Sequence, residues 1–363
     1  MIDVALVNYR GAADTLQALA RLAPWPHGTV WLVDNSAHET DMQADTEALR
    51  RACADWPWVQ LLTPGSNLGF GRACNLAFAQ SGAEYFLLLN PDARISVDDV
   101  LLLADTLAQQ PRLGAVSPKI FWNQTHSFVL PAAFAQTPWY HVAQALATHS
   151  RTVARWAALR GLRRAMRQMA SPQLFDVDFL AGAVMLLRRS AVLSADGLFD
   201  PDYFMFYEDS DLSLRLRRAG HALALVPSAS AVHEYRHKAF KADLMTQSQH
   251  QYFSKQYPLF YRWSAQLGRV PRLAGAVDLK QWFKVLAEPI RSVGEFNRQT
   301  GGAGVLAFSP TMLLMPAIFR PSVRAARPFD AQEWDLLEPG AYTAVLIETE
   351  SPRTQNWVYF LKA

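Results

Sequence analysis

The sequence predicts an α/β protein built on a mostly parallel sheet, and three observations support this class. Short apolar runs alternate with helical patterns over the first hundred residues, polar turns follow the apolar runs, and 50% of the 363 residues are apolar. Strands that alternate with helices form mostly parallel sheets covered on both faces. Only 18% of the residues are charged, which argues against an extended disordered or coiled-coil chain.

The first ninety residues carry this alternation in its clearest form. Ligands of such sheets lie at the carboxyl ends of the strands, where the polar turns of this sequence also fall. We therefore expect the functional residues at that edge. The strands are predicted at 4–8, 30–33, 59–62 and 85–89, and the helices at 12–22, about 41–54 and from the Gly-rich turn at 64–71 to residue 79.

The N-terminus and the cysteines indicate the compartment. The first nine residues carry an acid at Asp3 and no long apolar region, so they are typical of a first strand rather than of a secretory signal. Cys53 and Cys74 form no Cys-x-x-Cys pair, which argues against a zinc site and a disulfide framework. We expect a cytoplasmic protein in a reducing compartment.

The segment from 106 to 175 contains no acidic residue. Its basic residues are Arg112, Lys119, Arg151, Arg155, Arg160, Arg163, Arg164 and Arg167. The last four of these arginines recur at helical spacing. The same spacing is found for the apolar residues Trp156, Leu159, Leu162, Met166 and Met169. A basic amphipathic helix is therefore predicted at 151–169. Three roles stay open for it: a surface helix with solvated arginines, a contact with the membrane surface, or a contact with an anionic acceptor or partner protein.

The last hundred residues follow a different pattern. Residues 301–319 carry no charge and approach the length of a bilayer span, but Pro310 and Pro316 interrupt them, so a buried or interfacial strand-rich segment is expected. Strand-like runs follow at 342–347 and 357–361. We predict a main domain at 1–255 that contains the basic, partly helical insertion 106–175, a helical linker segment at 256–300, and a small β-rich appendage at 301–363.

Four polar clusters follow successive strands, and each alone is a weak signal, because Asx turns and single Gly-x-Gly turns are common. They are Val-Asp-Asn-Ser at 33–36, Asn-Leu-Gly-Phe-Gly-Arg-Ala-Cys-Asn at 67–75, Leu-Asn-Pro-Asp at 89–92 and Tyr-Glu-Asp-Ser-Asp-Leu at 207–212. Together and in this order, they resemble the inverting family 2 glycosyltransferases with the GT-A fold, and most closely the rhamnosyltransferase-like branch. The resemblance covers residues 1–255.

The resemblance implies a nucleotide-sugar site. Asp34 would accept a hydrogen bond from a pyrimidine imide, with a turn cap as its alternative role. Gly69 would let the backbone approach the nucleotide, and Arg72 would pair with the diphosphate. Asn67 and Asn75 would bind the nucleotide or hold the loop through side-chain-to-backbone bonds. The implied set is Tyr9, Asp34, Asn67, Gly69, Phe70, Arg72, Asn75, Asn90 and Asp92.

The resemblance also implies a divalent cation, Mg²⁺ or Mn²⁺. Asn90-Pro91-Asp92 stands where GT-A enzymes carry Asp-x-Asp, and Ala93 follows it, so only Asp92 offers a carboxylate. One carboxylate with phosphate oxygens and water suits either ion. His233 lies at the spacing of a metal-binding histidine in several GT-A enzymes. Its alternative is a structural histidine at the end of a strand.

Asp209 corresponds to the catalytic base of the family, which takes the proton of an acceptor hydroxyl while that oxygen displaces the nucleotide with inversion. Gly182 would lie against the sugar or the acceptor. Glu208 and Asp211 would orient the acceptor or cap the helix that follows. Because the helix dipole favours acids at a helix start with or without catalysis, the residues alone leave both roles open.

The branch implies dTDP-rhamnose as donor, with UDP-sugars next, and a growing surface glycan or a polyprenyl-linked acceptor. The helix at 151–169 would bring the enzyme to the inner face of the plasma membrane. No nucleic-acid partner is expected. A second hypothesis is an inactive sugar-nucleotide-binding scaffold, because Asn90 and Ala93 stand in place of acids. A Rossmann-type oxidoreductase is disfavoured, since residues 9–13 lack a dinucleotide-binding turn.

Overall fold

The computed structural model describes residues 1–130, 135–147, 150–234, 241–267, 279–286, 289–311, 314, 317–348 and 355–363. The chain divides into two compact units. The first is Met1–Lys119, Pro172–His233 and Ala242–Gln256, and the second is Ile120–Ser171, Glu234–Lys241 and Tyr257–Ala363. Most of the basic segment and the C-terminal residues, which lie far apart in the sequence, therefore belong to the same unit.

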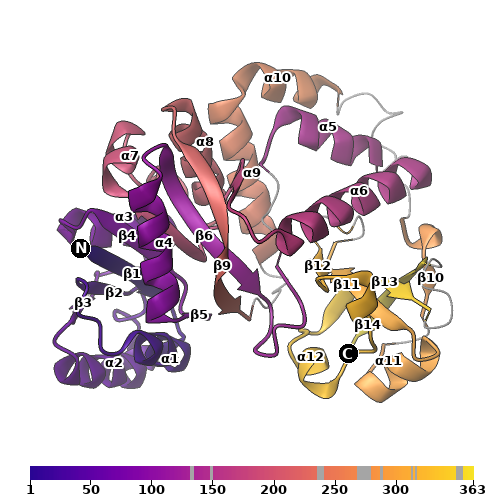
Figure 1. Cartoon of the computed structure of the whole chain (residues 1–363), viewed down its shortest axis with the longest axis horizontal. Coiled ribbons are helices and arrows are strands. Elements are labelled where there is room, and N and C mark those ends of the chain that lie inside the picture. The colour runs from indigo at the N-terminus through magenta and orange to yellow at the C-terminus, as the bar shows by residue number, and fades with distance from the viewer. Residues whose placement is uncertain are drawn as a thin grey trace. The chain divides into compact units, whose positions relative to one another are not determined.

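The first unit is built on one large sheet (Figure 1). Its strands lie in the order β3-β2-β1-β4-β8-β6-β9-β5, and β7 pairs with β9. The bounds are β1 (Ile2–Asn8), β2 (Val30–Asp34), β3 (Val59–Leu62), β4 (Tyr85–Leu89), β5 (Ala93–Ile95), β6 (Leu113–Phe121), β7 (Phe175–Val177), β8 (Val184–Arg188) and β9 (Ala222–His233). All seven residues of β1 are buried, as expected of a strand covered on both faces.

The parallel arrangement extends over the first four strands of this order. β2 pairs in parallel with β1 and β3, and β1 pairs in parallel with β4. In contrast, β8 runs antiparallel to β4 and β6, and β9 runs antiparallel to β5 and β7. The α/β class is confirmed, but the sheet is mixed rather than mostly parallel. The regular strand–helix–strand crossovers that keep neighbours parallel end after the first hundred residues.

The helices of the first unit alternate with these strands. They are α1 (Ala12–Leu22), α2 (Gln43–Asp55), α3 (Gly69–Gln80), α4 (Val97–Gln109), α7 (Arg189–Ser194), α8 (Glu208–Arg218) and α9 (Lys241–Gln256). The ranges predicted for α1, β3 and β4 agree with the structure. α4 shows a local start signal, because the Ser96 hydroxyl accepts a hydrogen bond from the Asp99 N–H at 3.1 Å.

The second unit contains a smaller sheet with the strand order β10-β14-β13-β11-β12 (Figure 1). Its strands are β10 (Lys284–Val285), β11 (Gly304–Ser309), β12 (Ile318–Phe319), β13 (Gly340–Ile347) and β14 (Gln355–Lys362). Its helices are α5 (Pro138–Ala147), α6 (Arg151–Ala170), α10 (Pro258–Leu267), α11 (Val293–Gln299) and α12 (Ala331–Asp335). The predicted strands near the C-terminus are confirmed, and β11 and β12 confirm the strand-rich segment. Pro316 lies outside the described residues.

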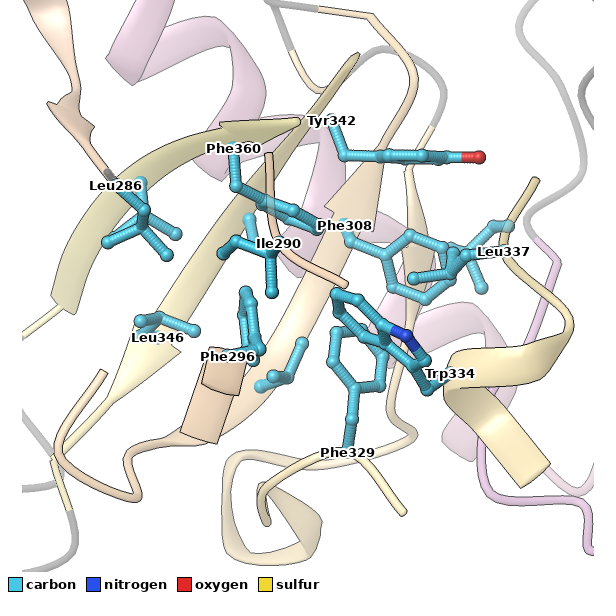
Figure 2. Close-up of a cluster of buried hydrophobic side chains, with 14 of the residues drawn as sticks. Leu286, Ile290, Phe296, Phe308, Phe329, Trp334, Leu337, Tyr342, Leu346 and Phe360 are labelled. Carbon is cyan, nitrogen blue, oxygen red and sulfur yellow. The ribbon is translucent and has the colours of Figure 1, made fainter. Parts of the chain in front are cut away.

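Aromatic side chains fill the core of the second unit, and Figure 2 shows their rings facing one another between the sheet and α12. The Phe296 ring lies 4.9 Å from Phe360, 5.4 Å from Phe329 and 5.5 Å from Trp334, measured between centroids. Such pairs add to the free energy of apolar burial. The second unit therefore has a hydrophobic core of its own.

A buried ion pair lies beside this core. Arg320 is 1% exposed and donates to both carboxylate oxygens of Glu333, at 3.2 and 3.0 Å. Glu333 also accepts a hydrogen bond from Arg327 at 2.9 Å and one from the Asp330 N–H at 3.1 Å. A buried guanidinium is stable only with such partners, so these residues tie α12 to the end of β12.

The basic helix forms as α6, and its buried face agrees with the predicted apolar stripe in part, because Leu162 and Met169 are buried as predicted. Trp156, expected in the apolar stripe, is 61% exposed. The buried residues of α6 are Ala154, Ala158, Leu162 and Met169. Small alanines let a helix lie close to its neighbour, which the spacing of large side chains could not reveal. Among the residues that the structure describes, no helix is long and apolar enough to cross a membrane.

Candidate active site

The carboxyl ends of β1 and β2 are joined by buried polar side chains. Asp34 accepts from the Asn8 amide at 2.8 Å, the Ser36 hydroxyl at 2.8 Å and the Thr46 hydroxyl at 2.7 Å. Its relative exposure is 0%. These are the contacts of a turn cap, the alternative role expected for Asp34. Its bond to a nucleotide base stays a prediction.

The Gly-rich turn before α3 is held by amide side chains. Asn67 accepts from the Gly69 N–H at 2.9 Å, which is an Asx turn. The Asn35 amide donates to the Gly69 carbonyl at 3.0 Å and accepts from the Leu68 N–H at 3.4 Å. Asn67 therefore makes a loop-holding bond. Sequence reasoning missed this role of Asn35, although it lies in the Val-Asp-Asn-Ser cluster.

Gly69 allows a close approach between this turn and the segment before α8. A Cβ atom at this position would lie 2.2 Å from the Phe204 carbonyl oxygen, and φ is +75°. The neighbouring Phe70 N–H donates to that oxygen at 3.0 Å. Only a residue without a side chain fits both conditions. Phe204 is a second contact that the sequence did not reveal, because it lies far from Gly69 along the chain.

Two further residues of the same motif also bind the segment before α8. The Asn75 side chain donates to the Phe199 carbonyl at 2.7 Å and accepts from the Phe199 N–H at 2.9 Å. Arg72 donates from Nε to the Pro201 carbonyl at 2.6 Å. The loop-holding alternative is thus realised for Asn75. Pairing of Arg72 with a diphosphate stays a prediction, and its guanidinium group is exposed.

Asp92 and His233 come together where β5 and β9 pair. Ala93 is directly opposite His233 in this antiparallel pair. The Nε2 atom of His233 lies 3.2 Å from an oxygen of Asp92, and the Asp92 side chain is 40% exposed. The turn that carries Asp92 is fixed by Asn90, whose N–H donates to the Ala183 carbonyl at 2.8 Å. The two predicted metal ligands are therefore neighbours.

Asp209 lies in the first turn of α8. Its carboxylate accepts from the Gly182 N–H at 3.1 Å and from its neighbour Ser210 N–H at 2.7 Å. Gly182 lies next to Ala183, which anchors Asn90. Gly182 therefore contacts the carboxylate of Asp209, and its neighbour Ala183 contacts the turn of Asp92. These two acids thus lie along the same edge of the sheet.

The backbone before α8 is strained. Phe206 and Tyr207 both have positive φ, 69° and 67°, although neither is glycine. Such residues persist only where the surrounding structure holds them. Here Ser248 of α9 donates to the Met205 carbonyl at 2.7 Å, and Gln249 donates to the Tyr207 hydroxyl at 2.8 Å. These contacts orient the start of α8, and with it Asp209.

The adjacent acids Glu208 and Asp209 both have raised pKa values. Burial raises the pKa of Asp209 to about 6, against the opposing effect of the N–H groups of Gly182 and Ser210. Burial, and secondly the charge of Asp209, raise the pKa of Glu208 to about 8. Both carboxyl groups are thus harder to ionise than free ones, and the N–H groups of Gly182 and Ser210 favour the negative charge on Asp209.

The remaining predicted residues are Asp211, Gly182 and Tyr9. Asp211 is fully buried and accepts from Arg215 and Gln256, each at 2.7 Å, which favours its helix-anchoring role. A Cβ atom on Gly182 would lie 3.5 Å from the Phe70 ring. Tyr9 is 46% exposed at the end of β1. Their contacts with a donor or an acceptor stay predictions.

One carboxylate and one imidazole are available to a divalent cation at this edge of the sheet. Oxygen and nitrogen ligands of this kind suit Mn²⁺, and Mg²⁺ needs mainly oxygens. Across the described residues, no group of three or more His, Cys, Asp or Glu side chains could hold a metal ion. The chemistry of Asp92 and His233 suits such a cation, and their role as its ligands stays a prediction.

Comparison with known proteins identifies the family. Residues 12–253 match the family described as glycosyltransferase like family 2, which is most of the chain. The chain belongs to this family. The predicted family is confirmed. The matched region contains all four polar clusters, and both units contribute residues to it.

Named relatives support the predicted branch of this glycosyltransferase. The N-acetylglucosaminyl-diphospho-decaprenol L-rhamnosyltransferase of Mycobacterium tuberculosis is 30% identical over 220 residues, which cover 58% of this chain and 67% of the relative. The rhamnosyltransferase WbbL of Escherichia coli is 26% identical over 211 residues, covering 53% and 70%. The chain is also similar to the mannosyltransferase PcManGT of Pyrobaculum calidifontis, solved with GDP-Man and Mn²⁺, at 18% identity, 76% and 73% coverage and a TM-score of 0.48.

We predict that Gly69→Ala destabilises the glycosyltransferase and weakens donor binding. The new methyl group would clash with the Phe204 carbonyl, and alanine at this positive φ costs about 1 kcal/mol or more. Thermal unfolding and nucleotide titration measure both effects. Gly65→Ala is the matched control in the same loop, because nothing lies within 4 Å of its Cβ position. Equal melting temperatures for the two variants would contradict the prediction.

Proposed function

We propose that this enzyme transfers a sugar, with rhamnose favoured, from a nucleoside diphosphate donor to a hydroxyl of a glycan or lipid-linked acceptor, with inversion. The observation that carries the proposal is Asp209, a carboxylate held by the Gly182 N–H at the start of α8. It keeps part of its surface exposed, so an acceptor can approach it. Glu208 beside it is buried, and burial and the charge of Asp209 raise its pKa to about 8.

The chemistry follows from one ionised and one neutral acid. Asp209 accepts the proton of the acceptor hydroxyl while the oxygen bonds to the anomeric carbon of the donor. The bond between that carbon and the diphosphate breaks on the opposite face, and the nucleoside diphosphate leaves with its electron pair. This displacement needs no covalent sugar–enzyme intermediate and inverts the configuration. The neutral Glu208 avoids a second charge beside Asp209.

A divalent cation would be held by Asp92 and His233. When bound, such an ion supplies positive charge that stabilises the leaving diphosphate. The 3.2 Å separation of the two side chains supports this assignment. The exposure of Asp92 leaves room for phosphate oxygens and water as further ligands.

The substrates are inferred from the relatives. The names of two relatives specify rhamnosyl transfer, and one names a decaprenol-linked acceptor. These names support a rhamnose donor and a polyprenyl-linked or glycan acceptor. The choice of dTDP-rhamnose, with UDP-sugars next, comes from the family resemblance. An enzyme with a lipid-linked acceptor would act at the cytoplasmic face of the plasma membrane.

An inactive scaffold is the second candidate, because Asn90 and Ala93 stand where acids are expected. Incubation with dTDP-rhamnose, Mn²⁺ and a polyprenyl diphosphate-linked sugar separates the two functions. Release of dTDP together with a glycosylated lipid supports transfer. Donor binding without turnover, under any combination of donor and acceptor tested, supports the scaffold.

We expect Asp209→Asn to lower the rate of transfer about 10²- to 10⁴-fold, the usual contribution of a general base. Donor affinity should change little, since the amide keeps the shape of the side chain. Product formation and donor titration are measured on the same preparation. Asp55→Asn, at the exposed end of α2, is the control. Transfer by Asp209→Asn at the rate of this control would refute the role of Asp209.

The pH profile should show a base with an apparent pKa of about 6. Below that pH Asp209 takes up a proton and cannot accept one from the acceptor, so kcat/KM should be about tenfold lower one pH unit below this pKa. Above it, the rate should level off as Asp209 becomes ionised. Initial rates from acid to neutral pH test this, and a rate independent of pH across the range would oppose the assignment.

Removal of either predicted metal ligand should raise the Mn²⁺ concentration needed for half-maximal transfer. We expect an increase of about tenfold or more for Asp92→Ala and for His233→Ala, typical of losses at a metal site. Calorimetric titration of Mn²⁺ in the presence of dTDP gives a readout independent of turnover. Asp98→Ala, an exposed acid in the first turn of α4, is the control. Identical Mn²⁺ titrations for all variants would exclude this site.

A further inference from the structure

The second unit exposes large apolar side chains on three helices. The exposed fractions are 83% for Trp139 and 57% for Leu146 on α5, 61% for Trp156 on α6, and 81% for Leu259 and 50% for Trp263 on α10. Single exposed apolar residues are normal on protein surfaces. Three tryptophans and two leucines on helices of one unit are unusual, because exposed groups of this kind mark interaction surfaces.

The outward side of α5 is apolar. Trp139 and Leu146 are two turns apart on one face of the helix, and Ala143 between them is also exposed. No residue of Pro138–Ala147 is charged. A helix that only faced water would carry charged residues on this side. The exposed face of α5 is therefore suited to an apolar or interfacial environment.

The outward side of α6 is basic. Arg160, Arg163, Arg164 and Arg167 are exposed, and no carboxylate of the described residues pairs with them. The guanidinium of Arg160 lies 5.4 Å from the centroid of the Trp156 ring. The opposite side of α6 is occupied, since Leu159 and Leu162 line a small gap with residues of the C-terminal sheet. The Trp–Arg side is exposed and therefore available to a partner.

α10 also exposes both apolar and basic side chains, and it lies against α5. Leu259, Arg262 and Trp263 are exposed at helical spacing. The rings of His141 on α5 and Phe260 on α10 lie 5.9 Å apart. α5 also packs against α6 (Figure 1). The three helices therefore form one contiguous region, and we call its exposed side the Trp–Arg face: Trp139, Leu146, Trp156, Arg160, Arg163, Arg164, Arg167, Leu259, Arg262 and Trp263.

We propose that the Trp–Arg face binds the surface of a bilayer that contains anionic lipid. Tryptophan and leucine enter the boundary between headgroups and acyl chains, and arginine pairs with lipid phosphates. Solvated arginines alone would not account for the exposed tryptophans, and an apolar protein partner would not account for the unpaired arginines. The membrane contact considered for α6 thus extends to α5 and α10, while the buried side chains of α6 pack within the second unit.

Cosedimentation of the full chain with vesicles tests this proposal without any sugar substrate. Wild-type protein should bind vesicles of phosphatidylcholine with phosphatidylglycerol, and added salt or vesicles of phosphatidylcholine alone should weaken binding. We expect Arg163→Gln/Arg164→Gln to lower binding about tenfold, since each basic residue contributes near an anionic surface. Leu146→Ser/Leu259→Ser should lower it about tenfold as well, through lost apolar burial.

Matched controls keep the result specific. Arg50→Gln/Arg51→Gln removes two adjacent arginines from α2, and Leu102→Ser/Leu193→Ser removes two exposed leucines from the first unit. Both control proteins should bind vesicles like wild type, and circular dichroism should show all variants folded. The proposal fails if wild type does not sediment with anionic vesicles, or if the face variants bind as the controls do. It also fails if the face variants only abolish self-association in size-exclusion chromatography.

Discussion

The approach of the Gly69 backbone to the Phe204 carbonyl is the constraint on which the geometry of the active site depends. The Gly-rich turn is held from one side by Asn35, after β2, and reaches Phe204 on the other through the Phe70 N–H. The segment between Phe204 and α8 then contains two residues with positive φ. Since the turn fixes one end of this segment and α9 contacts its middle, the strained backbone has little freedom. The start of α8 is thereby positioned.

That position determines the protonation of the two acids. A carboxylate in a partly enclosed site is harder to ionise, and a second carboxylate beside it is harder still. Main-chain N–H groups of Gly182 and Ser210 reach only Asp209, so the negative charge is stabilised there. Glu208 lacks a partner for its buried Oε2 atom within the described residues. The pKa values of the two neighbouring acids therefore differ because the backbone N–H donors face Asp209 and not Glu208.

The second unit uses its arginines in two opposite ways. Arg320 is buried and satisfied by Glu333, and its guanidinium also lies 4.0 Å from the Phe128 ring. Within the described part of the chain, no carboxylate pairs with Arg160, Arg163, Arg164 or Arg167 on the outer side of α6. A buried charge needs compensation inside the protein, while an exposed one can be used for an external anion. The same residue type thus supports the core in one place and a binding surface in another.

Most of the local structure could be predicted from the sequence, because hydrophobic periodicity and turn residues act over short distances. The ranges of α1, β3 and β4, the four polar clusters and the C-terminal strands required no further information. The directions of β8 and β9 and the exposure of Trp156 on α6 could not be predicted, since they depend on packing between distant segments. The sequence by itself determined which chemistry-bearing residues exist, and the family resemblance implied Asp92 and His233 as metal ligands, a role that stays a prediction. Only the tertiary structure decided that these two meet, and that Asn75 and Asp211 anchor loops and helices, because hydrogen bonds between distant residues form only after the chain folds.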